Sequence, residues 1–489
     1  MKYYKTTIIC LMAFIISSKN IAQSSINKNL SEIIKLAQSQ SIALKVSQTK
    51  KDISNYEYLS FKSNLKPQIT INGNLPSYSK QYSPVVQPDG TITFLPVKQN
   101  LSNIGIGISQ KLLFSGGDIS VNTNLSRFDE FKTKYVQYNG TPIFIKLNQP
   151  LFSTNDIKWQ RKIEPLKLDE SIRLNIQEIE FIAQNVTSKY FNVIDAQNNS
   201  NMANVNVVAT TNNYEIEKKR VILGKTSEDK LLQLELQMLN SKQAYEKAKY
   251  DYQIALLDLK SFLGNTDSAD YNLILPEVIP EFNINVLDAL KYANQNRAEF
   301  ISFQRKKLER AKDVALAKAA KQQVILTASF GYNRAAEDLN SIYLYPQDQQ
   351  TFSLGFNLPI IDWGRRKMAL YTAKSLEKLT EYNNEIDKNN INQEIVTLVK
   401  NIALMRSNIN LARITDSVGQ RRFQISNRLF QEGKVSITDL NIAQNEKDLA
   451  KRNYINSLRS FWDAYYYLRR LTLFDFDNQK SLFGTLSKK

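Results

Sequence analysis

The sequence predicts a mainly α-helical protein with membrane β-strands, built from two tandem copies of a helix–strand–helix unit. First, residues of one half recur in the other at one ungapped offset, as in Gly224 and Gly433 (433 − 224 = 209). Second, Leu166–Leu223 and Arg365–Val418 contain neither Gly nor Pro, which indicates very long helices. Third, segments such as Thr351–Leu358 alternate strictly between apolar and small or polar residues, which is typical of strands.

The first 22 residues are typical of a secretory signal peptide. Lysines precede a short apolar run, Thr7–Ile16, and polar residues follow as far as Ala22. We expect cleavage after Ala22, with Gln23 as the first mature residue; the alternative is a buried N-terminal helix. Cys10 is the only cysteine, so the mature chain would contain no disulfide and no thiol lipid anchor.

Composition disfavours an enzyme, a metal site and a nucleic-acid-binding protein. The sequence has no histidine, which is the commonest general base and transition-metal ligand, and it has no Gly-rich phosphate loop. The formal net charge is +17, and three lysines would leave with the signal peptide (17 − 3 = +14). On an exported protein this charge favours contact with anionic lipid headgroups or cargo. We therefore expect no catalytic residue, no cofactor and no metal.

Each copy is expected to contain a helix, strands, and then two long helices joined by a turn. The first helix of copy one is predicted from Leu30 to Leu65, and its counterpart from Val286 to Lys321. The predicted boundaries are a signal peptide at 1–22; a helix, strands and a long helical hairpin at 23–66, 67–152 and 153–281; and the same elements at 282–322, 323–361 and 362–489.

The helix after Gly224 carries a heptad pattern typical of coiled-coil packing. Large residues recur every seven positions at Leu231, Met238, Tyr245, Tyr252 and Leu259. In copy two the neighbouring row of the heptad is mostly small, with Ala443, Ala450, Ser457 and Ala464. Small residues let helices approach closely, which favours a curved wall of packed helices. A solid coiled coil is the alternative.

The strand segments predict a membrane β-barrel. In Val324–Tyr332, for example, apolar residues alternate with smaller or more polar ones, as in the strands of such barrels. A soluble sandwich shows the same alternation, but the signal peptide and the lack of an apolar run of about 20 residues favour the membrane. Pro76–Asn100 and Arg334–Gln350 are then expected as extracellular loops. The few strands of one protomer cannot close a barrel, so association of protomers must complete it.

Copy one also contains an insertion among its strands. Upstream matches such as Ala37 and Ala293 have an offset of 256, which exceeds the downstream offset by 47 (256 − 209 = 47). Ile104–Gln110 resembles Ile143–Gln149, so we expect the insertion to form one extra hairpin, with strands within Asn103–Arg127. The hairpin either enlarges the barrel to six strands per protomer, which we favour, or folds outside it.

This pattern resembles the TolC-like outer-membrane efflux family over essentially the whole mature chain. The segments that carry the resemblance are Asn148–Phe152, Asn357–Gly364, and the turns Gly224–Ser227 and Gly433–Leu440. The resemblance implies a homotrimer in the outer membrane, with a β-barrel and a long periplasmic α-helical barrel. It implies a channel of a tripartite efflux or type I secretion system that passively conducts substrates. The channel would dock on a periplasmic adaptor and an inner-membrane pump.

The resemblance also implies the site residues. The two turns would be the adaptor-docking tips, with Gly224, Lys225, Ser227, Gly433, Lys434 and Ser436. The alternative, which we favour for the Gly and Ser residues, is that they only end one helix and cap the next. Asp439 matches an acidic ring at the narrow end of the tube, and Lys230 occupies the equivalent position in copy one (439 − 209 = 230). The family's best-studied member closes its tip with a Tyr/Arg latch, but Phe430 and Val435 stand at those positions here. We expect Asp439 and Lys230 of neighbouring hairpins to close the gate instead; the alternative is that Lys230 points to solvent.

Two rival functions remain at the level of sequence. A trimeric coiled-coil surface adhesin with a membrane anchor would have one continuous stalk, whereas strands interrupt the helices of this sequence twice. A metal-efflux duct would be expected to contain histidine or many methionines, and the sequence has no histidine and six methionines. The sequence does not choose among drugs, bile salts, siderophores and secreted proteins as cargo.

Overall fold

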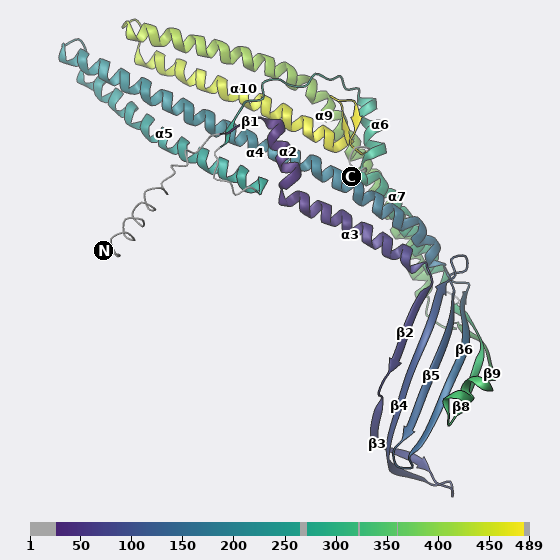
Figure 1. Ribbon diagram of the computed structural model, residues 1–489. Coiled ribbons are helices and arrows are strands. Elements are labelled where there is room, and N and C mark those ends of the chain that lie inside the picture. Colours follow the sequence, from purple (N-terminus) through teal and green to yellow (C-terminus); the bar gives the residue numbers. More distant parts are fainter. Residues whose placement is uncertain (1–25, 265–270, 321–322, 359, 484–489) are drawn as a thin grey trace, which may run out of the picture. The chain divides into compact units, whose positions relative to one another are not determined.

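The computed structural model describes residues 26–264, 271–320, 323–358 and 360–483 (Figure 1). The predicted signal peptide and its cleavage site lie outside these residues. The chain divides into two compact units. The first, here called the helical unit, comprises the chain up to Lys50, 172–297, and the chain from Asn390 onward. The second, the sheet unit, comprises Lys51–Ser171 and Ala298–Asn389.

The helices confirm the tandem duplication, because each helix of copy one has a counterpart of nearly equal length in copy two. The pairs are α2 (Leu30–Gln40) with α6 (Val286–Asn296), α3 (Ile42–Asn64) with α7 (Ala298–Ala319), α4 (Asp156–Ile222) with α9 (Arg365–Gln431), and α5 (Glu228–Leu263) with α10 (Ile437–Thr472). Both α4 and α9 contain 67 residues, which corresponds to about 100 Å at 1.5 Å per residue. Each continues into an antiparallel hairpin with α5 or α10 (Figure 1).

The first helix of each copy is broken, where the sequence predicted one continuous helix. The break falls at Ser41 between α2 and α3, and at Arg297 between α6 and α7. Both residues have extended backbone angles, with ψ of 146° and 143°. Each is nevertheless buried, at 0% and 8% exposed. The break therefore turns the chain within a packed region, and no Pro or Gly marks it in the sequence.

Two short sheets lie in the helical unit. β1 (Ile26–Lys28) pairs in parallel with β7 (Tyr271–Leu273), and β10 (Phe474–Asp475) pairs with β11 (Lys480–Ser481). Tyr190 of α4 is fully buried, and its hydroxyl donates a hydrogen bond to the carbonyl of Lys28, 3.2 Å away. Tyr190 therefore connects β1, at the start of copy one, to the long helix α4.

The sheet unit contains one antiparallel sheet of seven strands. The strands are β2 (Gln68–Asn74), β3 (Tyr78–Val86), β4 (Ile92–Lys111), β5 (Asp118–Glu130), β6 (Tyr135–Leu151), β8 (Gln323–Ala336) and β9 (Gln347–Asn357). Their order is β2-β4-β5-β6-β8-β9, and β3 pairs with the first half of β4. β6 and β8 join the two copies directly. The inserted segment of copy one therefore lies inside the sheet as β4 and β5, as the sequence predicted.

The prediction is wrong for one of the two expected extracellular loops. Pro76–Asn100 was expected to be an extracellular loop, but it contains β3 and the first residues of β4, paired from Tyr78↔Asn100 to Val86↔Ile92. The turn between them is closed by Asp89, whose carboxylate accepts hydrogen bonds from the amide and hydroxyl of Thr91, and by Gly90 at φ 84°. The other predicted loop contains a short helix, α8 (Leu339–Leu344).

No helix in the described ranges is both long and apolar enough to cross a membrane.

Candidate functional site

The turn between α9 and α10 is built around Ser436 and Asp439. Gly433 takes the left-handed conformation that ends α9, at φ 74°. Ser436 caps α10: its hydroxyl accepts from the amide of Asp439 at 3.1 Å and donates to the Asp439 carboxylate at 2.7 Å. Hydrogen bonds from the hydroxyl and then the backbone amide of Ser436 to this carboxylate lower the pKa of Asp439 below its usual value. The predicted gate residue therefore also stabilises the start of its own helix.

The turn between α4 and α5 is held differently. Gly224 again ends the helix with a positive φ of 64°, but the Ser227 side chain makes no capping hydrogen bond. Instead, the hydroxyl of Thr226 donates to the carboxylate of Glu217 at 2.7 Å. Glu217 is only 5% exposed and also pairs with Arg220 at 3.1 Å. A buried carboxylate in the preceding helix, α4, therefore holds this turn.

Arg220 links the two turns, which the sequence analysis missed. Its guanidinium donates a hydrogen bond to the carbonyl of Gln431, 3.4 Å away, at the end of α9. In copy two the positions equivalent to Glu217 and Arg220 hold Ser426 and Leu429. This departure from the repeat was the sequence signal for the link. A charged pair that occurs in only one copy indicates a contact that the other copy does not make.

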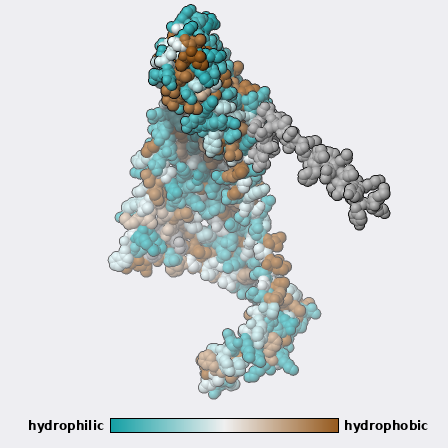
Figure 2. Space-filling view, turned by 90° about the vertical axis from the view of Figure 1, so that its left-hand side faces the viewer, coloured by the Kyte–Doolittle hydropathy of each residue, from teal (hydrophilic) through white to brown (hydrophobic). Residues whose placement is uncertain are grey.

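The remaining predicted tip residues lie at the surface. Lys225 and Lys230 are exposed, and Lys434 forms a surface pair with Glu432 at 2.7 Å. Among the described residues, no hydrogen bond or ion pair joins Asp439 to Lys230 within one chain. The surface near the first turn is also apolar, since Ile222 and Leu223 are 77% and 68% exposed. Figure 2, which looks toward the hairpin ends, shows hydrophobic patches among hydrophilic side chains there.

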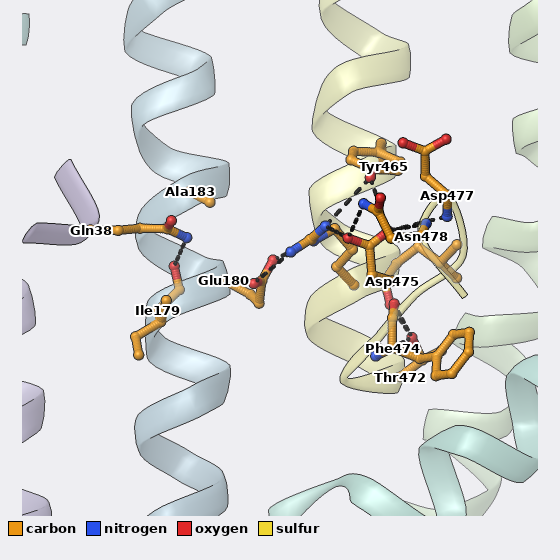
Figure 3. Close-up of polar contacts among 12 residues, drawn as sticks. Gln38, Ile179, Glu180, Ala183, Tyr465, Thr472, Phe474, Asp475, Asp477 and Asn478 are labelled. Atoms are coloured by element: carbon orange, nitrogen blue, oxygen red, sulfur yellow. Dashed lines mark hydrogen bonds and ion pairs between the residues drawn. The ribbon is translucent and has the colours of Figure 1, made fainter. Parts of the chain in front are cut away.

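A polar cluster in the helical unit contains Glu180, Tyr465 and Asp475, which Figure 3 labels, and Arg469 of α10. Its guanidinium forms two hydrogen bonds to Glu180 of α4, at 2.8 and 3.1 Å, and a further one to Asp475. Burial disfavours the charge of Arg469, but Glu180 outweighs it, so the pKa of Arg469 is raised. Burial raises the pKa of Tyr465 to about 12. The cluster joins α4, α10 and the C-terminal hairpin.

The sheet has one apolar face and one polar face. On the apolar face, exposed side chains from every long strand lie side by side: Ile69, Ile71, Ile104, Ile106, Ile108, Val121, Ile143, Ile145, Phe330, Phe352, Leu354 and Phe356. The opposite face carries mostly glycine and polar residues, with Phe144, Lys146 and Ile325 among them. An exposed apolar face of this extent indicates a hydrophobic environment around the sheet.

The outer membrane efflux protein family model matches residues 33–265 and 290–472. The chain belongs to the outer membrane efflux protein family. Its two matched segments correspond to the two copies of the repeat. No curated protein matches the sequence.

Solved structures of outer membrane channels share the fold of this efflux protein. The Campylobacter jejuni CmeC channel matches with a TM-score of 0.67 and 16% identity, over 94% of this chain and 88% of that one. The open Neisseria gonorrhoeae MtrE channel matches with 0.64 and 15%, over 91% and 88%. Vibrio cholerae VceC matches with 0.63 and 13%, over 91% and 95%.

Family and fold are thus those of efflux channels rather than of enzymes. The match does not support the alternative of a surface adhesin. Among the described residues, no group of His, Cys, Asp and Glu is arranged to hold a metal ion. For this efflux protein, the informative surfaces are therefore the two-faced sheet and the turns at the hairpin ends.

Proposed function

We propose that three copies of this protein form the outer-membrane channel of a tripartite efflux or type I secretion system. The channel passively conducts substrates from a periplasm-spanning pump to the exterior. The observation that carries the proposal is the sheet: one face is apolar and exposed, and neither edge has a partner strand in the part of the chain that the structure describes. Every residue of β2 and of β9 is exposed. In lipid such edges must pair, because no water is present to satisfy their backbone groups.

The strand order supports closure by further copies. β2, β4, β5, β6, β8 and β9 alternate in direction, so β9 of one copy runs antiparallel to β2 of the next. Three copies with six such strands each would form a barrel of eighteen (3 × 6 = 18). Barrels of about 16–18 strands leave an aqueous channel. The inserted hairpin of copy one, β4 and β5, therefore widens the barrel.

The hairpin turns support docking and gating. We propose that Gly224, Lys225 and Ser227, with Gly433, Lys434 and Ser436, form the tips that dock on a periplasmic adaptor. The exposed Ile222 and Leu223 add an apolar contact surface. We propose that Asp439 and Lys230 of neighbouring hairpins pair when the gate is closed; solvent exposure of Lys230 is the alternative.

Cysteine cross-linking tests the channel. β2 and β9 of one copy are separated by four strands, or roughly 24 Å at 4.8 Å per step, so a disulfide between them must join two copies. I71C is combined with F352C, L354C or F356C, all on the apolar face. Oxidation in outer membranes is expected to give covalent trimers for at least one pair.

The matched control combines I71C with S353C, which lies on the opposite face of β9 and should not cross-link. A ladder that continues beyond the trimer, or monomers with every same-face pair, would contradict a closed trimer.

A further inference from the structure

One part of the polar face of the sheet is almost free of charge. The register defines this region, from the row Gln68↔Ser109↔Ser120↔Lys146↔Ser329↔Thr351 to the row Asn74↔Asn103↔Ser126↔Asn139↔Ala335. The polar-face residues between these rows are Thr70, Asn72, Gly105, Gly107, Asn122, Asn124, Thr141, Phe144, Gly331, Asn333, Gln347 and Gln349. Lys146 is the one charged residue in the whole set.

The uncharged residues around Lys146 bond to one another. The Asn333 amide donates to Asn139 at 2.9 Å, Asn122 donates to Ser120 at 3.0 Å, and Thr327 donates to Asn148 at 3.2 Å. These groups are held in place by neighbouring strands, and they offer dipoles but no net charge. Within this region of described residues, Lys146 therefore carries the only net charge.

Nothing in the described chain neutralises Lys146 by direct contact. Its register partners are Ser120 and Ser329, and it forms no ion pair with a described carboxylate. The nearest acid along β5 is Asp118, whose carboxylate accepts a hydrogen bond from Asn148 at 3.3 Å. Asp118 is also the register partner of Lys111, so these two opposite charges offset each other.

Lys146 belongs to the face that would line the channel. Its neighbours in sequence, Ile145 and Leu147, lie on the apolar face, since side chains alternate along a strand. A lysine on the lipid side would be costly, whereas lumen-facing residues tune selectivity. In the proposed trimer, three copies of Lys146 would lie at one height around the lumen.

We propose that Lys146 makes this channel prefer anions over cations, so that its barrel favours anionic or neutral polar cargo. This inference rests on the proposed channel function. Rings of lysine or arginine select anions in other pores, because a positive potential concentrates anions and repels cations. The other residues of this region are uncharged. Substitution of Lys146 should therefore remove most of the anion preference that the barrel contributes.

The test is the reversal potential of single channels in planar bilayers under a KCl gradient. Low salt is used, about 0.01 M against 0.1 M, because the Debye length is then roughly 10–30 Å. The parent channel is expected to favour chloride over potassium. K146Q should shift the permeability ratio toward potassium by roughly twofold or more, and K146E should shift it further. The control K98Q, an exposed lysine of β4 outside this region, should keep the parental ratio.

A second measurement avoids any effect on assembly. In K146C channels already in the bilayer, a cationic methanethiosulfonate should restore the preference for chloride, and an anionic one should reverse it. Equal permeability ratios for the parent, K146Q and labelled K146C would overturn the inference while leaving the channel function intact. A purified parent trimer that forms no conducting channel would overturn both.

Discussion

Arg469 of α10 and Glu180 of α4 form a two-pronged ion pair inside the helical unit, with nitrogen–oxygen distances of 2.8 and 3.1 Å. Glu180 is 3% exposed, and Arg469 also contacts Asp475 in the C-terminal hairpin. The pair joins residues 289 positions apart (469 − 180 = 289) and therefore connects the two copies of the repeat. Because both charges are largely removed from water, each depends on the other.

Removing Arg469 should destabilise the helical unit strongly. R469M leaves the Glu180 carboxylate buried without its partner, which costs about 3–5 kcal/mol in comparable buried pairs. The free energy of unfolding is measured by urea titration of the detergent-solubilised protein, followed by circular dichroism. The control R422M breaks the exposed pair of Arg422 with Glu446, and should change stability by at most about 1 kcal/mol. Equal losses of unfolding free energy in both variants would contradict a larger contribution from the buried pair than from the exposed one.

Asp475 should make the fold sensitive to acid. Burial raises the pKa of Asp475, but the hydrogen bonds from Asn478 and the charge of Arg469 outweigh burial, and the pKa is lowered overall. Its contribution to stability is therefore present above the unfolded pKa, about 3.9, and is lost as pH falls through the folded pKa. Thermal unfolding between pH 7 and 3 should show a shallower acid loss in D475N than in the parent. D477N, an exposed residue of the same turn, should follow the parent.

The gate proposal predicts non-additive effects at the tip. D439A and K230A should each raise the open probability of single channels in planar bilayers, and the double variant should add little to either. Asp439 also takes part in the cap with Ser436, so S436A serves as the control that weakens the cap and retains the carboxylate. Parental open probability in both single variants would place the gate elsewhere. An increase in S436A equal to that in D439A would assign the effect to helix capping.

Gly331 should tolerate no side chain. A Cβ there would lie 2.5 Å from the carbonyl oxygen of Ile143 and 2.9 Å from Phe144 on the neighbouring strand. G331A should therefore weaken the pairing of β6 with β8, at a cost of about 1–3 kcal/mol, and lower the temperature at which trimers dissociate in detergent. G355A is the matched control, because the nearest atom to its Cβ is 3.8 Å away. A parental dissociation temperature for G331A would contradict this close packing.

The sequence by itself determined the duplication, the long helices and the alternating strands. These features are repeated or periodic, so they can be recognised from residue spacing alone. The hairpin within the inserted segment followed from the same reasoning, because β4 and β6 share a pattern. Family membership was expected from a resemblance, carried by the segments Asn148–Phe152 and Asn357–Gly364 and by the turns Gly224–Ser227 and Gly433–Leu440.

Only the tertiary structure decided the features that depend on partners distant in the chain. The breaks at Ser41 and Arg297 have no Pro or Gly signal, and the pairing of β3 with β4 replaces a predicted loop. The choice of Glu180 as the partner of Arg469 likewise depends on how α4 and α10 pack. The link from Arg220 to the carbonyl of Gln431 uses a backbone group, which any residue provides. Such contacts do not produce a repeated or periodic residue pattern, because they form only when segments distant in the sequence pack together.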